Sequence, residues 1–156
     1  MIRQEIPGWG AVELWHLVLD LNGTLALDGV PILGVADRLD ALSPHLAIHL
    51  MTADTRGQAS QVSQQLGVQL VRIEPRDEAD QKRAFVERLG ARQVAAIGNG
   101  ANDAGMLSAA ALGIAVLGQE GLAAEALQAA DVIVVSIEDG LDLLLHPQRL
   151  VATLRR

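Results

Sequence analysis

Short apolar runs alternate along the chain with segments in which apolar residues recur at helical spacing. The runs are rich in Val, Leu and Ile, and several have no polar residue at alternate positions. This pattern is typical of strands that are covered on both faces in a parallel sheet. We predict strands at residues 13–20, 46–51, 69–73, 93–97, 113–117 and 131–135.

Four of the segments between these runs carry a helical stripe of apolar residues. The stripes are Val35, Leu39 and Leu42; Ala59, Val62 and Leu66; Phe85 and Leu89, after a candidate N-cap at Asp77; and Ile137, Leu141 and Leu144. Strands that alternate with helices predict an α/β fold, an open doubly wound parallel sheet with right-handed crossovers. The irregular residues 25–34, which contain Asp28-Gly29 and Pro31, predict a short hairpin or flap.

Composition narrows the class of protein. Half of the 156 residues are hydrophobic and only 2% are aromatic, so Leu, Val, Ile and Ala must build the core. There is no cysteine for a disulfide or a thiolate metal site, and the net charge of −7 argues against nucleic acid or an anionic membrane as the main partner. Residues 1–10 do not form a signal peptide and the longest apolar stretch, 109–118, cannot span a bilayer, so we expect a cytoplasmic protein.

The most informative motif is Leu-Val-Leu-Asp-Leu-Asn-Gly-Thr at residues 17–24. A buried strand that ends on Asp20 presents one carboxylate at its carboxyl end, where it can act as a covalent nucleophile toward phosphorus. The Gly23-Thr24 turn offers backbone N–H groups for phosphoryl oxygens. In doubly wound sheets ligands bind at this edge, and polar residues also follow the second and fourth predicted strands.

Two further residues are candidates for binding a phosphoryl group. Thr52 stands between a strand and a helix, where its hydroxyl and the helix N-terminus favour an anion. The alternative is a plain N-cap by Thr52, Asp54 or Thr55. Lys82 could neutralise the nucleophile and the phosphoryl charge, although most lysines are solvated surface residues.

The fourth segment follows the strand at 93–97 and reads Gly98-Asn99-Gly100-Ala101-Asn102-Asp103. Its glycines permit close approach of a ligand, and its oxygen-bearing side chains suit Mg²⁺ together with phosphate and water. A turn with an asparagine cap is the alternative. The dinucleotide-binding fingerprint fails, because Asp103 stands where its third glycine would be.

In order and spacing, these four segments resemble the four motifs of the haloacid dehalogenase superfamily of phosphotransferases. The chain is most similar to the phosphorylation domain of P-type ATPases and to small soluble P-type ATPase-like proteins, in the spacing from Lys82 to Gly98 and in the run at 130–135. The resemblance covers residues 13–140, and it implies a single domain over residues 1–156 with its core there.

The resemblance also implies roles for individual residues. Asp20 would form an aspartyl-phosphate, with Asn22 at the position of the usual acid/base. The phosphoryl oxygens would be bound by Thr52, Ala53, Lys82 and Gly23. A Mg²⁺ ion would be held by Asp20, the backbone carbonyl of Asn22, Asn99 and, directly or through water, Asp103, with Thr24 and Asn102 supporting these ligands.

Two positions depart from the family pattern. Most family phosphatases carry aspartate where this chain has Asn22, and an amide can neither protonate a leaving group nor deprotonate water. General acid–base catalysis contributes about 10²–10⁴-fold, so we expect slow turnover or a long-lived aspartyl-phosphate. Asn99 replaces a usual metal-binding aspartate, which predicts weaker metal binding.

Only 27 residues lie between Thr24 and Thr52, which leaves no room for a large cap domain. By analogy with capless family members, which often form homotetramers, we expect a homo-oligomer in which residues 25–34 contact a neighbouring subunit.

Three functions remain open at this point. The first is a Mg²⁺-dependent phosphatase of a small phosphorylated metabolite. The second is a catalytically impaired binding or regulatory module, which the amides at Asn22 and Asn99 favour. The third is a receiver-type phosphoacceptor, although such domains gather acidic residues after their first strand and place the phosphoacceptor later in the chain. Ion pumping is excluded, because neither membrane spans nor a nucleotide-binding insert fit into this length.

Overall fold

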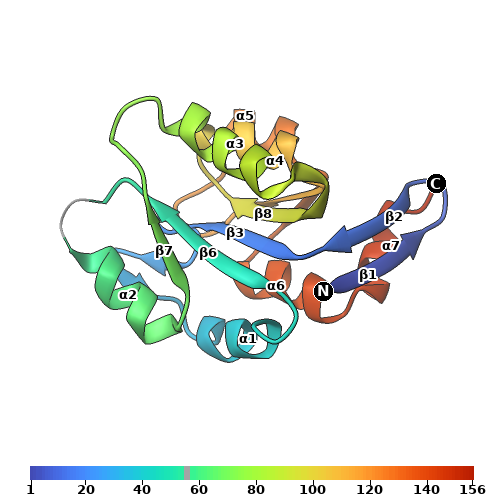
Figure 1. Ribbon diagram of the computed structural model, residues 1–156, viewed down its shortest axis with the longest axis horizontal. Helices are drawn as coiled ribbons and strands as arrows, with labels where there is room; N and C mark the ends of the chain where they lie inside the picture. Colours follow the sequence, from blue (N-terminus) through green and yellow to red (C-terminus); the bar gives the residue numbers. More distant parts are fainter. Residues whose placement is uncertain (55–56) are drawn as a thin grey trace.

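A sheet of six parallel strands forms the middle layer of the computed structural model, which describes residues 1–54 and 57–156 (Figure 1). The strand order is β10-β9-β8-β3-β6-β7. The strands are β3 (His16–Asp20), β6 (Ala47–Thr52), β7 (Gln69–Arg72), β8 (Val94–Gly98), β9 (Leu112–Val116) and β10 (Val132–Val134). The predicted α/β fold with a doubly wound parallel sheet is therefore confirmed.

Helices cover both faces of this sheet (Figure 1). One face carries α3 (Glu78–Leu89), α4 (Ala104–Ala109) and α5 (Ala124–Ala129), and the other carries α1 (Val35–Leu42), α2 (Gln58–Leu66), α6 (Ile137–Leu145) and α7 (Gln148–Leu154). Short 3₁₀ turns, η1 (Ala91–Gln93) and η2 (Ala101–Asp103), flank β8. Because side chains alternate along a strand, Leu17 and Leu19 enter one core and Val18 the other.

The register aligns the carboxyl ends of the three central strands. Asp20 of β3 pairs with Met51 of β6, and Leu19 pairs with Ile97 of β8. From β3 the chain winds outward through β6 and β7, and then returns to the other side of β3 at β8. The reversal beside β3 is the place where such sheets bind ligands.

The predicted strand at 13–20 is wrong in its first part. Residues 13–14 belong to β2 (Gly10–Leu14), which pairs antiparallel with β1 (Ile2–Ile6) in a separate hairpin. The pairing of β3 with its neighbours begins at His16, opposite Ala47 and Val94, whereas Glu13 and Leu14 pair with Arg3 and Ile2 of β1. Helix α7 packs on β1, which extends the core beyond the predicted range 13–140.

Two predicted N-caps also differ. Asp77 stands before α3 in a left-handed conformation (φ 50°), and its side chain makes no capping hydrogen bond. Helix α2 begins only at Gln58, too far along the chain for Thr52 to cap it, and the Asp54 carboxylate accepts a hydrogen bond from the Ala59 N–H instead (3.1 Å). The third candidate cap, Thr55, lies outside the described residues.

Residues 25–34 contain a short antiparallel hairpin of β4 (Ala26–Leu27) and β5 (Val30–Pro31).

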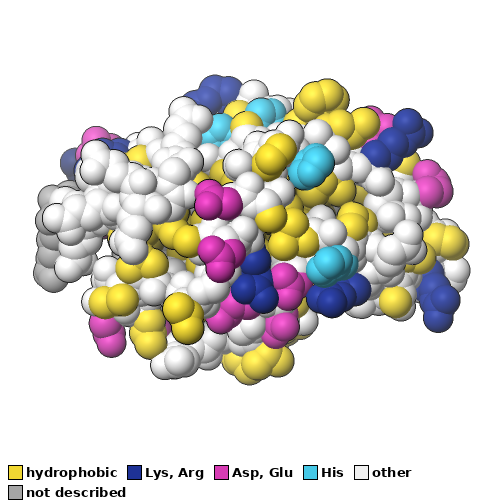
Figure 2. All heavy atoms as spheres, turned by 90° about the horizontal axis from the view of Figure 1, so that it is seen from below, with side chains coloured by type: hydrophobic (Ala, Val, Ile, Leu, Met, Phe, Trp, Pro, Cys, Tyr) yellow, Lys and Arg dark blue, Asp and Glu magenta, His cyan; other side chains and the backbone are white. Residues whose placement is uncertain are grey.

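On the face seen in Figure 2, acidic and basic side chains lie next to one another among hydrophobic ones. Within residues 1–54 and 57–156, no helix is long and apolar enough to cross a membrane.

Candidate active site

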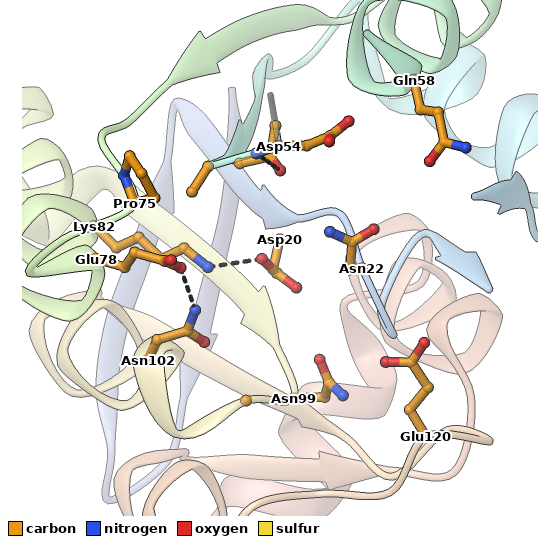
Figure 3. Close-up of a pocket in the computed structure, with 13 residues that line it drawn as sticks. Asp20, Asn22, Asp54, Gln58, Pro75, Glu78, Lys82, Asn99, Asn102 and Glu120 are labelled. Carbon is orange, nitrogen blue, oxygen red and sulfur yellow. Dashed lines mark hydrogen bonds and ion pairs between the residues drawn. The ribbon is translucent and has the colours of Figure 1, made fainter. Parts of the chain in front are cut away.

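A cleft of about 500 Å³ opens at the carboxyl edge of the central strands (Figure 3). Of the residues singled out from the sequence, those that line it are Asp20, Asn22, Thr52, Ala53, Lys82, Asn99 and Asn102. Gly23, Thr24 and Asp103 lie behind this lining. The structure thus brings all four sequence motifs to one edge of the sheet.

A buried cluster of three charges forms the floor of the cleft. Nζ of Lys82 lies 2.7 Å from Oδ1 of Asp20 and 2.7 Å from Oδ1 of Asp103. Lys82 is only 1% exposed and Asp103 is fully buried. Lys82 comes from the second turn of α3, and it is the only lysine in the sequence. A buried ammonium needs such partners, because a charge without them would be very costly in the interior.

The same cluster controls the protonation of Asp20. Burial and the nearby Asp103 carboxylate raise the pKa of Asp20 to about 7, although Lys82 acts in the opposite direction. Burial alone would lower the pKa of Lys82, but Asp20 and Asp103 together raise it. Lys82 therefore stays protonated, and Asp20 changes its charge near neutral pH.

Asp103 uses both carboxylate oxygens inside the protein. Oδ1 contacts Lys82, and Oδ2 accepts hydrogen bonds from the N–H groups of Asn99 (3.0 Å) and Gly100 (2.9 Å). Gly98 makes room for it, since a Cβ there would lie 2.5 Å from the carboxyl carbon of Asp103. This arrangement makes Asp103 a positioning residue for Lys82 and the loop, and of the two contacts expected from the sequence it favours the one through water over direct metal contact.

The turn after Asp20 differs from the prediction. The Gly23 N–H donates to the Ala26 carbonyl (2.9 Å), and the Thr24 N–H donates to the Leu21 carbonyl (3.3 Å). These two amides are thus bonded within the turn, whereas the sequence motif predicts that they are free for phosphoryl oxygens. Thr52 is 3% exposed, and its hydroxyl oxygen accepts a hydrogen bond from the Asp54 N–H (3.0 Å), which leaves its O–H to donate.

On the opposite side of the cleft, Asn99 connects the β3 turn to the loop that follows β9. Its Oδ1 accepts a hydrogen bond from the buried Thr24 hydroxyl (3.1 Å), and its Nδ2 donates to the Gly121 carbonyl (3.1 Å). Asn102 donates to Oε2 of Glu78 (2.7 Å) at the start of α3. The two predicted supporting residues, Thr24 and Asn102, therefore hold other side chains of the site.

Three polar residues of the cleft were not identified from the sequence: Gln58, Glu78 and Glu120. Glu120 follows β9 by four residues. The rule that placed Asn99 after β8 therefore applies to this loop as well, and it would have identified Glu120.

No family model matches the chain, but one curated protein is similar in sequence and solved structures are similar in fold. The chain is 47% identical over 64 residues to the uncharacterized protein MJ0073 of Methanocaldococcus jannaschii. That match covers 41% of this chain and 69% of the relative, so the two proteins belong to one family.

Two solved structures show the fold. The 3-deoxy-D-manno-octulosonate 8-phosphate phosphatase of Moraxella catarrhalis, in complex with magnesium ion, phosphate ion and KDO, matches with a TM-score of 0.70 at 17% identity, over 89% of this chain and 90% of that one. The catalytic domain of the CPx-ATPase CopB-B matches with a TM-score of 0.58 at 25% identity, over 74% of this chain and 46% of that one. The chain therefore has the fold of haloacid dehalogenase family hydrolases, which the structure of a HAD family hydrolase from Streptomyces avermitilis also matches (TM-score 0.69, 17% identity, 87% of each chain). No large cap lies between the β3 turn and β6, where the chain forms only β4, β5 and α1.

Proposed function

We propose that this protein is a Mg²⁺-dependent phosphatase that acts on a small phosphorylated metabolite through an aspartyl-phosphate on Asp20. The observation that supports this most strongly is the buried lysine between two carboxylates at the carboxyl edge of the sheet. A fully buried lysine with two carboxylate partners is not the solvated surface residue of the alternative interpretation.

In this proposal, an oxygen of the Asp20 carboxylate attacks phosphorus, and the bond from phosphorus to the leaving oxygen breaks. Thr52 and Lys82 hold the phosphoryl oxygens and orient the group for attack. Water then attacks the phosphorus of the aspartyl-phosphate, and the bond between phosphorus and the Asp20 oxygen breaks. Inorganic phosphate and the free Asp20 carboxylate are released. Asn22 can neither give nor take a proton, so water exchanges the protons in both steps and the second step is slow.

The donor set beside Asp20 fits a hard divalent cation. It consists of carboxylate, amide and backbone oxygens from Asp20, Asn99 and Asn22, and hard oxygen donors are what Mg²⁺ prefers. The cation would neutralise the charge of the phosphoryl group during transfer.

The substrate class follows from the likeness to the Moraxella enzyme only in part. That enzyme acts on a phosphorylated sugar acid, as its name states. This chain shares its fold at 17% identity, so we extend to it the small phosphorylated substrate and not the sugar acid.

The test is phosphate release from a panel of phosphorylated metabolites and p-nitrophenyl phosphate, with Mg²⁺ or with EDTA. We expect Mg²⁺-dependent release by the wild type, loss in Asp20→Asn, and retention in Asp80→Asn, which changes an exposed carboxylate of α3. If neither the wild type nor Asp80→Asn releases phosphate, the second candidate, a binding or regulatory module impaired by Asn22 and Asn99, replaces this proposal.

A further inference from the structure

The candidate cation site has few negative charges of its own. One oxygen of Asp20 is bonded to Lys82, both oxygens of Asp103 are used elsewhere, and Asn22 and Asn99 are neutral. Figure 3 shows that the other oxygen of Asp20 faces the side of the cleft where Asn22, Asn99 and Glu120 lie. Among these three side chains, only Glu120 carries a charge.

Glu120 reaches this place from the loop after β9. It is exposed at the mouth of the cleft, and both its carboxylate and the Asn99 amide lie beside Gly23. A Cβ at Gly23 would lie 2.4 Å from Oε2 of Glu120 and 2.7 Å from Nδ2 of Asn99. The absence of a side chain at Gly23, where φ is +76°, therefore lets both groups approach the turn that carries Asn22.

Asn99 holds the loop that carries Glu120. Its Nδ2 donates to the carbonyl of Gly121, the next residue, and its own carbonyl accepts a hydrogen bond from the Ala123 N–H (2.9 Å). An aspartate at position 99 could not donate the first of these bonds, because an ionised carboxylate only accepts. The amide of Asn99 therefore fixes the position of the loop that carries the Glu120 carboxylate.

We propose that Glu120 supplies the anionic ligand for the divalent cation of this site, in place of a carboxylate at position 99. Asp20 and Glu120 then hold the ion from two sides, with neutral oxygens from Asn22 and Asn99 between them. This inference rests on the cation site of the proposed function, but it concerns binding of the ion and does not require turnover.

The test measures binding of Mn²⁺ alone, by electron paramagnetic resonance of the free ion and by competition with Mg²⁺. We expect Glu120→Gln to weaken Mn²⁺ binding about tenfold or more, and Glu78→Gln to change it less than twofold. Glu78 is the matched control, because its carboxylate lines the same cleft but is bonded to Asn102 on the other side of Lys82. The double variant Asn99→Asp/Glu120→Gln should bind Mn²⁺ more tightly than Glu120→Gln alone.

The proposal is overturned if Glu120→Gln binds Mn²⁺ within twofold of the wild type, if Glu78→Gln loses as much affinity, or if the wild type binds no Mn²⁺ at millimolar concentration. Circular dichroism of each variant verifies the fold. Phosphate release is measured on the same samples. Altered ion binding without release in any sample contradicts only the proposed function, whereas release that depends on Asp20 with unaltered ion binding contradicts only the role of Glu120.

Discussion

At the residue scale, the charge cluster of Asp20, Lys82 and Asp103 dominates the behaviour of the site. Removing one member of a buried ion pair is costly, because the remaining charge has no compensation and little water. We expect Lys82→Met to lower the free energy of unfolding by about 3–5 kcal/mol at pH 8, measured by urea denaturation. Arg83→Met is the control, since Arg83 is the next residue of the same helix but forms an exposed pair with Glu87. Equal midpoints for the two variants would contradict this.

The raised pKa of Asp20 predicts how stability depends on pH. The folded protein binds a proton at Asp20 up to about pH 7, whereas the unfolded chain loses it near 3.8, the ordinary pKa of an aspartate. Stability from this group is therefore complete below pH 3.8 and is lost as the pH rises through 7, by at most about 4 kcal/mol. Asp20→Asn removes this loss. The melting temperature of Asp20→Asn minus that of the wild type should increase from pH 5 to pH 8, and a difference that stays constant would refute the assignment.

Asn22 should limit the second chemical step. Asn22→Asp restores a group that can exchange a proton, so we expect phosphate release to rise about 10²-fold. The amount of acid-stable phosphoenzyme trapped on quenching should fall at the same time. An unchanged rate with unchanged trapping would mean that the site lacks activity for reasons other than Asn22.

The apolar runs mark where the strands end, and this placed Asp20, Thr52 and Asn99 at one edge of the sheet. Lys82 lies on a helix, and only the family resemblance assigned it to the site. The sequence did not reveal the hydrogen bonds that decide which groups are available. The Gly23 amide is used by Ala26, and Asp103 is used by Lys82 and the loop. Such pairings depend on three-dimensional distance and not on spacing along the chain.

At the scale of elements, the six apolar runs all became strands of one sheet, because parallel strands buried on both faces leave a strong hydrophobic signal. The β1–β2 hairpin and α7 were not predicted. They pack on each other at the far end of β3, so each has its partner more than a hundred residues away. The local pattern of hydrophobic residues cannot predict a contact between segments so far apart in the sequence.

Helices α1 and α6 are joined by a forked ion pair. Nε of Arg38 lies 2.7 Å from Oδ1 of Asp142, and its Nη2 donates to Oδ2 at 3.2 Å. Arg38 lowers the pKa of Asp142. The contribution of the pair to stability is therefore present above the unfolded pKa of an aspartate, and it is lost as the pH falls through the lower folded value.

We expect Arg38→Met to lower the urea midpoint at pH 7 and to lower it less at pH 3. Lysine at this position should recover only part of the loss, because it cannot form the fork. Arg149→Met serves as the comparison, since Arg149 is 3.9 Å from the same carboxylate and largely exposed. A penalty for Arg38→Met that is independent of pH would point to lost packing and not to the ion pair.

At the scale of the whole molecule, the most exposed large apolar side chains of the described residues lie in two places. Val30 and Leu33, in and after the β4–β5 hairpin, are 67% and 92% exposed, and Ile133 and Val135, in and after the edge strand β10, are 51% and 72% exposed. Exposed apolar surface on this scale favours association with another protein surface.

We therefore expect a solution mass that is a multiple of the 16.5 kDa chain, measured by light scattering after gel filtration. Leu33→Glu should reduce it. Leu127→Glu, on α5 and 47% exposed, should not. A wild-type mass of one chain would end the expectation of a homo-oligomer.

The single lysine gives this molecule an internal chemical probe. Reagents for primary amines modify side chains only at lysine, and here that lysine is 1% exposed beneath the cleft. If the protein is acylated and the peptide that contains Lys82 is then analysed by mass spectrometry, the rate of modification reports how often this buried amine becomes exposed to solvent. A phosphate analogue that closes the cleft should slow that modification, without any label having been introduced.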